Sequence, residues 1–158
     1  MCWVCDHPEA TKAARLAYVR GLLEEHPWVV IGVDREGYRA PYSYTVGLTE
    51  LNLPELVITG LSKGRAADVL LAVAEKVLDT GAPTTGAQIR LPGRRPGEIV
   101  RVTEPGVHLA VAADLFGERL SAVQLVYADL RGRWPWDKDF RNGRGGQPVL
   151  GPRCREAA

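Results

Sequence analysis

The chain has 158 residues, of which 46% are hydrophobic and 25% are charged, the balance of an ordinary globular domain. Its 20 basic and 19 acidic residues leave a formal net charge of +1, which argues against wholesale attraction to nucleic acid or membranes. The odd cysteine count, the lack of an apolar run of about 20 residues and the lack of a signal segment argue against a disulfide-rich secreted domain or a membrane protein. We therefore expect one cytoplasmic domain spanning residues 1–158.

The chain begins with a short arm, residues 1–7 (MCWVCDH), which carries two thiols and an imidazole. Asp6 and Glu9 have the spacing of a helix capping box, and Pro8 suits a first helical turn. We therefore predict a helix from this point to about His26. One face of this helix carries its apolar residues, Leu16, Val19 and Leu23.

Three strands with short connections are predicted next. Residues 28–33 are apolar and β-branched, and a turn at 34–37 ends in glycine. Residues 42–48 alternate between apolar and polar side chains, the period of a half-buried strand, and 56–59 form a shorter apolar run. Because the connections are short, we predict an antiparallel meander.

A second helix is predicted from Ser62, a favourable N-cap, to about Asp79. The apolar face of this second helix comprises Ala66, Val69, Leu70, Val73, Ala74 and Val77. We expect this face to share one core with the apolar face of the first helix. Residues 81–97 are rich in glycine, proline and threonine and predict a long loop with a short strand at 87–91.

The remaining segments complete an α+β fold. Residues 98–104 predict a strand, 108–116 a short helix and 121–127 the last strand, followed by a glycine-rich stretch at 142–146 and a loose tail at 153–158. We predict a mostly antiparallel sheet of about five to six strands with two principal helices packed on it. One face of the sheet should lie on the core and the other beneath loops or a partner, such as a second copy in a homodimer.

Several stretches of the sequence form a recognisable set. They are MCWVCDHP, PYSYTVGLTELNLPELVITGL, EIVRV with a nearby histidine, and QLVYADLRGRWPWDKDF followed by GGQPVLGP. The set covers nearly the whole chain and resembles the bacterial family catalogued as domain of unknown function 4262. Because that family is named for its lack of a function, the resemblance implies no catalytic residues, and the candidate sites rest on chemistry alone.

The N-terminal arm offers a candidate metal site. Cys2 and Cys5 form a C-x-x-C pair, which brings two sulfurs to one side of a turn, and His7 adds a nitrogen ligand. These three residues could bind zinc, with Cys154 or the N-terminal amine as the fourth ligand. The alternatives are redox chemistry at the thiol pair and a reduced arm whose thiols pack against Trp3 or the first helix.

His108 is the candidate general base. Asp114 and Glu104 are the nearby carboxylates, and the hydroxyls of Tyr42 and Tyr44 are its prospective partners. The alternative is that His108 caps or packs a helix end.

Trp134, Trp136 and Asp137 form the last candidate site. Two indoles around a proline, beside glycine-rich backbone, could form a stacking wall with an anion-binding nest. The alternative is a structural cover over one end of the sheet.

The sequence leaves three functions open. The first is a binding or interaction domain without turnover, whose partner is a small molecule or a protein. The second is a zinc-binding protein, and the third is an enzyme of unfamiliar type. The predicted binding residues are Tyr44, His108, Trp134, Trp136 and Asp137. We expect no membrane partner, and the near-neutral charge argues against nucleic acid.

Overall fold

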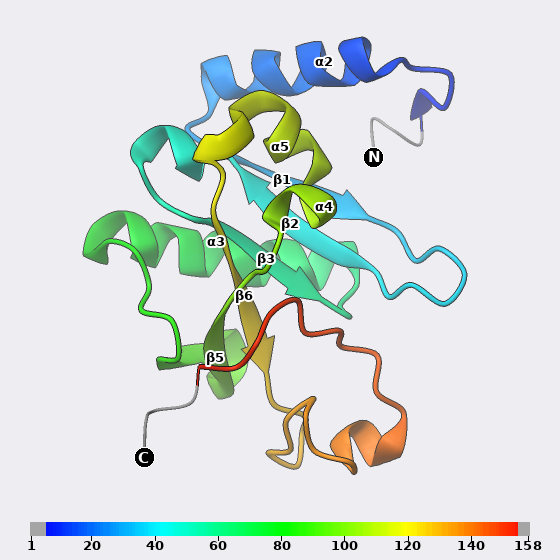
Figure 1. Cartoon of the computed structure of the whole chain (residues 1–158), viewed down its shortest axis with the longest axis vertical. Helices are drawn as coiled ribbons and strands as arrows, with labels where there is room; N and C mark the ends of the chain where they lie inside the picture. Colours follow the sequence, from blue (N-terminus) through cyan, green and yellow to red (C-terminus); the bar gives the residue numbers. More distant parts are fainter. Residues whose placement is uncertain (1–5, 155–158) are drawn as a thin grey trace.

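The computed structural model describes residues 6–154 and shows an α+β fold in which helices cover both faces of one six-stranded sheet (Figure 1). The strands are β1 (Val29–Val33), β2 (Tyr42–Val46), β3 (Glu55–Thr59), β4 (Gln88–Leu91), β5 (Arg95–Arg101) and β6 (Ala122–Tyr127). The α-helices are α2 (Lys12–Glu25), α3 (Lys63–Thr80), α4 (Pro105–His108) and α5 (Ala110–Phe116). Short 3-10 turns are η1 (Leu48–Leu51), η2 (Pro92–Arg94), η3 (Gly117–Arg119) and η4 (Phe140–Gly143). The predicted fold class and the mostly antiparallel sheet are confirmed.

The first three strands form the predicted antiparallel meander, with Tyr44 of β2 opposite Val57 of β3. The connection between β2 and β3 is held from inside by the fully buried carboxylate of Glu55. This carboxylate accepts hydrogen bonds from the backbone N–H groups of Leu48 and Thr49, at 2.8 and 3.1 Å. It thereby satisfies the first N–H groups of η1, which no carbonyl of that turn can reach.

Strands β3 and β6 form the parallel pair of the described sheet, whose order is β1-β2-β3-β6-β5-β4. The chain leaves β3 into α3 on one face of the sheet and enters β6 from α5 and η3 on the other face (Figure 1). Because the two strands run in the same direction, their carboxyl ends meet at one end of the sheet. In open α/β sheets, ligands bind in the crevice outside the carboxyl ends of the strands.

Helices α2 and α3 lie on opposite faces of the sheet, so the prediction that they share one core is wrong. Leu70 of α3 packs in a cluster with Leu56 and Ile58, whereas Val19 of α2 packs in a second cluster with Val57. Successive residues of a strand point to opposite faces, so β3 contributes to both clusters. The apolar stripe of a helix shows that the helix is buried, but not against which face.

The first helix begins later than predicted. α2 starts at Lys12, where the hydroxyl of Thr11 accepts a hydrogen bond from the backbone N–H of Ala14 at 3.1 Å. The expected capping box of Asp6 and Glu9 therefore does not start this helix. A threonine with extended backbone angles is an equally good cap.

Two other boundaries also differ. The strand predicted at 98–104 runs from Arg95 to Arg101. His108 ends α4 instead of starting the next helix, because Leu109 (φ −101°, ψ 65°) interrupts the helical backbone. No helix within residues 6–154 has the length and apolar character needed to cross a membrane.

The last described segment is fastened to the sheet. The side-chain amide of Gln147 accepts from the N–H of Tyr127 at 3.0 Å and donates to its carbonyl at 2.9 Å, in place of a neighbouring strand. Arg153 forms a two-point ion pair with the buried carboxylate of Glu98. The prediction of a loose tail is therefore wrong for Arg153, and the residues beyond Cys154 lie outside the described part of the chain.

Candidate functional site

A cavity of about 360 Å³ opens at the carboxyl ends of β3 and β6, between the start of α3 and the turn joining β4 to β5. Its size lies within the range of small-molecule sites, roughly 300–1,000 Å³. Apolar side chains form much of its wall: Ile58, Leu61, Val69, Leu91 and Leu130. The polar side chains in the wall are Arg65, Asp68, Arg95 and Tyr127. We call this cavity the arginine pocket.

Tyr127, the last residue of β6, is almost fully buried behind the arginines. Its hydroxyl donates a hydrogen bond to the carbonyl of Thr59 and accepts one from Nη2 of Arg141, both at 2.9 Å. The guanidinium carbons of Arg95 and Arg141 lie 5.4 and 5.5 Å from the ring centre, within cation–π distance. Burial raises the pKa of Tyr127, although the charges of Arg141, Arg95 and Arg65 oppose the rise. The phenol therefore stays protonated and orders the arginines around it.

Arg141 is positioned by Asp129 in the loop after β6. One carboxylate oxygen of Asp129 accepts from the N–H groups of Arg131 and Arg133, each at 2.9 Å. The other accepts from Nε of Arg133 and from the N–H of Arg141, each at 2.8 Å. Burial would raise the pKa of Asp129, but these hydrogen bonds outweigh it and hold the pKa well below its usual range. The ionised carboxylate folds this loop and directs Arg141 toward Tyr127.

Arg65 and Arg95 give the pocket its positive charge. Within residues 6–154, neither guanidinium has a carboxylate within ion-pair distance, and Asp68 is the one acidic residue of the described lining. A guanidinium group donates paired N–H groups whose geometry matches carboxylate and phosphate oxygens. The pocket can therefore bind an anion against an apolar wall.

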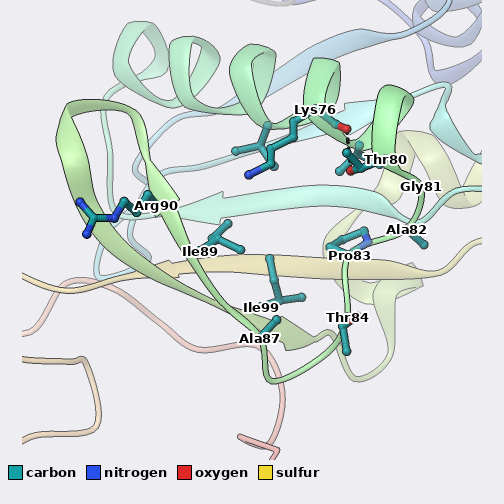
Figure 2. Close-up of a pocket in the computed structure, with 12 residues that line it drawn as sticks. Lys76, Thr80, Gly81, Ala82, Pro83, Thr84, Ala87, Ile89, Arg90 and Ile99 are labelled. Carbon is teal, nitrogen blue, oxygen red and sulfur yellow. Dashed lines mark hydrogen bonds between the residues drawn. The ribbon is translucent and has the colours of Figure 1, made fainter.

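A second cavity of about 210 Å³ lies farther along α3 and β4, and we call it the α3–β4 cavity. Figure 2 shows Ala87, Ile89 and Ile99 on its sheet side, facing Lys76 and Thr80 of α3. The loop that follows α3 closes one end. Its interior is mostly aliphatic, and it has no counterpart of the pair Arg65 and Arg95.

Tyr44 and His108 lie on the sheet face opposite α3. The rings of Tyr42 and Tyr44 stack with their centres 6.2 Å apart. The hydroxyl of Tyr42 donates to the backbone carbonyl of His108 at 2.9 Å, and that of Tyr44 accepts from the N–H of Val111 at 3.2 Å. The two tyrosine hydroxyls thus bond to the backbone of His108 and Val111 and not to the imidazole. Neither cavity described above is lined by Tyr44 or His108. A general-base role for His108 stays a prediction.

Trp134 and Trp136 stack on each other, with ring centres 5.3 Å and planes 6° apart. The carboxylate of Asp137 accepts from the N–H of Trp134 at 2.8 Å, and the guanidinium of Arg153 lies 4.3 Å from the centre of the Trp136 ring. Figure 1 shows the segment between β6 and η4 beyond one end of the sheet and well away from α4, so the structure does not bring the two tryptophans to His108. A ligand-binding role for the indoles stays a prediction.

The zinc hypothesis concerns an arm that is only partly described. Cys2 and Cys5 lie outside the described residues, and His7 is exposed. Cys154 is an exposed thiol beside Gly86, which bonds to β5, and Figure 1 shows α2, which follows His7, well apart from β5. Among residues 6–154 no group of three or more His, Cys, Asp or Glu side chains could hold a metal. Zinc binding by Cys2, Cys5 and His7 stays a prediction.

None of the residues that form and support the arginine pocket was predicted as a site residue: Arg65, Arg95, Tyr127 and Arg141. They come from four separate segments, and only the strand order places them together. The available signal was that Arg65 follows one apolar strand closely and Tyr127 ends another. A parallel pairing of those two strands would have placed both segments at the same end of the sheet.

Residues 22–141 match the model of the family described as Domain of unknown function (DUF4262). The matched region contains all six strands and every residue of the arginine pocket. No curated protein and no solved structure matches the chain.

Proposed function

The chain belongs to the DUF4262 family, and we propose that it acts as a binding domain for a small anionic ligand held in the arginine pocket. One observation carries the proposal. Arg65 and Arg95, which have no ion-pair partner within residues 6–154, flank a cavity whose wall is largely apolar. Charges beside an apolar wall are screened less than charges in open water, so an anion there gains more from each guanidinium.

The pocket residues have distinct roles in this proposal. Arg65 and Arg95 contact the anion. The ring of Tyr127 lies against the guanidinium of Arg95, and Arg141 donates a hydrogen bond to the Tyr127 hydroxyl. The hydroxyl of Tyr127 already has a donor and an acceptor partner, so its ring, and not its hydroxyl, faces the ligand. The apolar wall contacts the uncharged part of the ligand. The pocket thus supplies charge and apolar surface, the two requirements of selective binding.

This proposal narrows the first function expected from the sequence, a binding or interaction domain, to the binding of a small anion. We further propose that the ligand is a small molecule and not nucleic acid, because the net charge of +1 provides no broad positive field for nucleic acid. We also propose that binding takes place in the cytoplasm, since the three cysteines do not suit a disulfide-stabilised secreted domain.

Isothermal titration calorimetry with inorganic phosphate at low salt tests the proposed function. Arg95→Gln should weaken binding at least about tenfold, because a hydrogen bond to a charged group contributes about 1.5–3 kcal/mol. The matched control is Arg20→Gln, which changes an exposed arginine of α2 on the opposite face of the sheet. If phosphate does not bind, or if the two variants bind it equally well, the pocket is not an anion site.

A further inference from the structure

The α3–β4 cavity and the arginine pocket are neighbours along the same two elements. On α3, Val69 lines the arginine pocket and Val73, one turn later, lines the α3–β4 cavity. On β4, Leu91 lines the first and Ile89, two residues earlier and on the same side of the strand, lines the second. These side chains all belong to, or pack against, one apolar cluster. The two cavities are therefore neighbours along α3 and β4, with the side chains of Val73 and Leu91 at their adjoining ends.

The interior of the α3–β4 cavity is suited to an aliphatic group. Val77, Ile89 and Ile99 form its walls, and the hydroxyl of Thr80 is already bonded to the carbonyl of Lys76 at 2.8 Å. Figure 2 shows the guanidinium of Arg90 extending away from the aliphatic side chains. Lys76 and Arg90 are both exposed, so their charges lie at the rim, where their aliphatic stems can cover an apolar chain.

We propose that the ligand is an amphipathic anion: its charged head binds Arg65 and Arg95, and its unbranched alkyl chain runs between α3 and β4 into the α3–β4 cavity. This rests on the proposed function, because the head occupies the same arginine pocket. The positive charge at one end and the aliphatic interior at the other match the two halves of such a molecule.

The dimensions limit the chain length. Val69 and Val77 are about 12 Å apart along the helix axis, at 1.5 Å per residue. A volume of about 210 Å³ holds roughly seven atoms if each takes the about 30 Å³ of a water molecule. A chain of about eight to ten carbons would reach the cavity and fill it, whereas shorter chains would stay near the arginine pocket.

Calorimetric titration with inorganic phosphate and with hexyl, octyl and decyl phosphate, below their micelle concentrations, tests this assignment. Each methylene that enters the cavity should raise the affinity by up to about fourfold. We therefore expect a gain of at least about tenfold from hexyl to decyl phosphate. Ala87→Leu, which fills the cavity, should abolish that gain and leave the affinity for inorganic phosphate unchanged. Ala13→Leu on α2 is the matched control, and melting curves confirm that both variants fold.

The two proposals fail in different ways. If Arg95→Gln weakens phosphate binding but chain length adds nothing, or if the gain survives Ala87→Leu, the alkyl assignment is wrong and the anion site stands. If inorganic phosphate does not bind, or if Arg95→Gln leaves the affinity for phosphate unchanged, the anion site itself is wrong. Vesicles containing phosphatidic acid separate a free ligand from a membrane surface: we expect no binding, and vesicle binding that is insensitive to Ala87→Leu would refute the assignment to the cavity.

Discussion

The buried carboxyl group of Glu55 should make the protein less stable as the pH rises from about 4.5 to about 7. Its side chain is fully buried and accepts hydrogen bonds from the N–H groups of Leu48 and Thr49 and from the hydroxyls of Thr49 and Thr45. Burial raises the pKa of Glu55 from the usual 4.5 to about 7, because desolvation of the charged form outweighs those hydrogen bonds. The folded protein therefore holds a proton that the unfolded chain has already released.

The sign and size of the effect follow from this difference in pKa. Below about pH 4.5 the carboxyl is neutral in both states, and its full contribution to stability is present. Between about pH 4.5 and 7 the unfolded chain releases this proton while the folded protein keeps it, so the contribution falls as the pH rises and is fully lost above about pH 7. The two pKa values differ by about 2.5, and one pKa unit corresponds to about 1.4 kcal/mol, so the loss is about 3 kcal/mol.

Urea denaturation of the wild type and of Glu55→Gln between about pH 5 and pH 8 measures this loss. The glutamine variant cannot titrate at this position, so subtracting its curve removes the contribution of the histidines and of other groups. The advantage of the wild type over Glu55→Gln should shrink by about 2.5 kcal/mol over this range, which covers most of the titration. If the two stability curves run parallel, Glu55 is ionised at neutral pH and the reasoning about its burial is wrong.

Three further predictions concern the two cores, a glycine contact and the charge of the pocket. Leu70→Ala should lower the free energy of unfolding, measured by urea denaturation, by about 3 kcal/mol. Because Leu70 and Val19 lie on opposite faces of the sheet, the effects of Leu70→Ala and Val19→Ala should add within about 0.5 kcal/mol in the double variant. A double variant that departs strongly from this sum would contradict the separate clusters. Gly60→Ala should lower the melting temperature sharply, because Gly60 has φ +78° and a β-carbon there would collide with the backbone carbonyl of Gly146. Gly64→Ala, which has open space around it, should leave the melting temperature nearly unchanged. Asp68→Asn should strengthen phosphate binding a few-fold at low salt and less at high salt, and weaker binding of phosphate by this variant would count against the charge argument.

The sequence predicted the local elements better than their arrangement. Alternating side chains and glycine turns were sufficient to place the first three strands and to order them as a meander. The pairing of β3 with β6 could not be read in the same way, because the two strands lie more than sixty residues apart and their contact depends on the path of everything between them. The face on which α2 packs was wrong for a related reason, since an apolar stripe at helical spacing fits either face.

The candidate site could not be predicted from the sequence, because its residues come from distant segments that only the fold brings together. Arg65, Arg95 and Tyr127 look unremarkable in their own segments, as a helix surface residue, a turn arginine and the end of a strand. Local clusters such as Trp134 and Trp136 are visible in the sequence without knowledge of the fold. A site assembled from distant segments becomes visible only when the strand order is known.

The central claim is that Arg65 and Arg95 bind an anion together, and NMR of the arginine Nε–H groups during a phosphate titration tests it most directly. The signals of Arg65 and Arg95 should shift along saturating curves with one shared dissociation constant, while that of Arg20 stays in place. Shifts that are small, linear and alike at all three arginines would show only nonspecific association and would contradict the account.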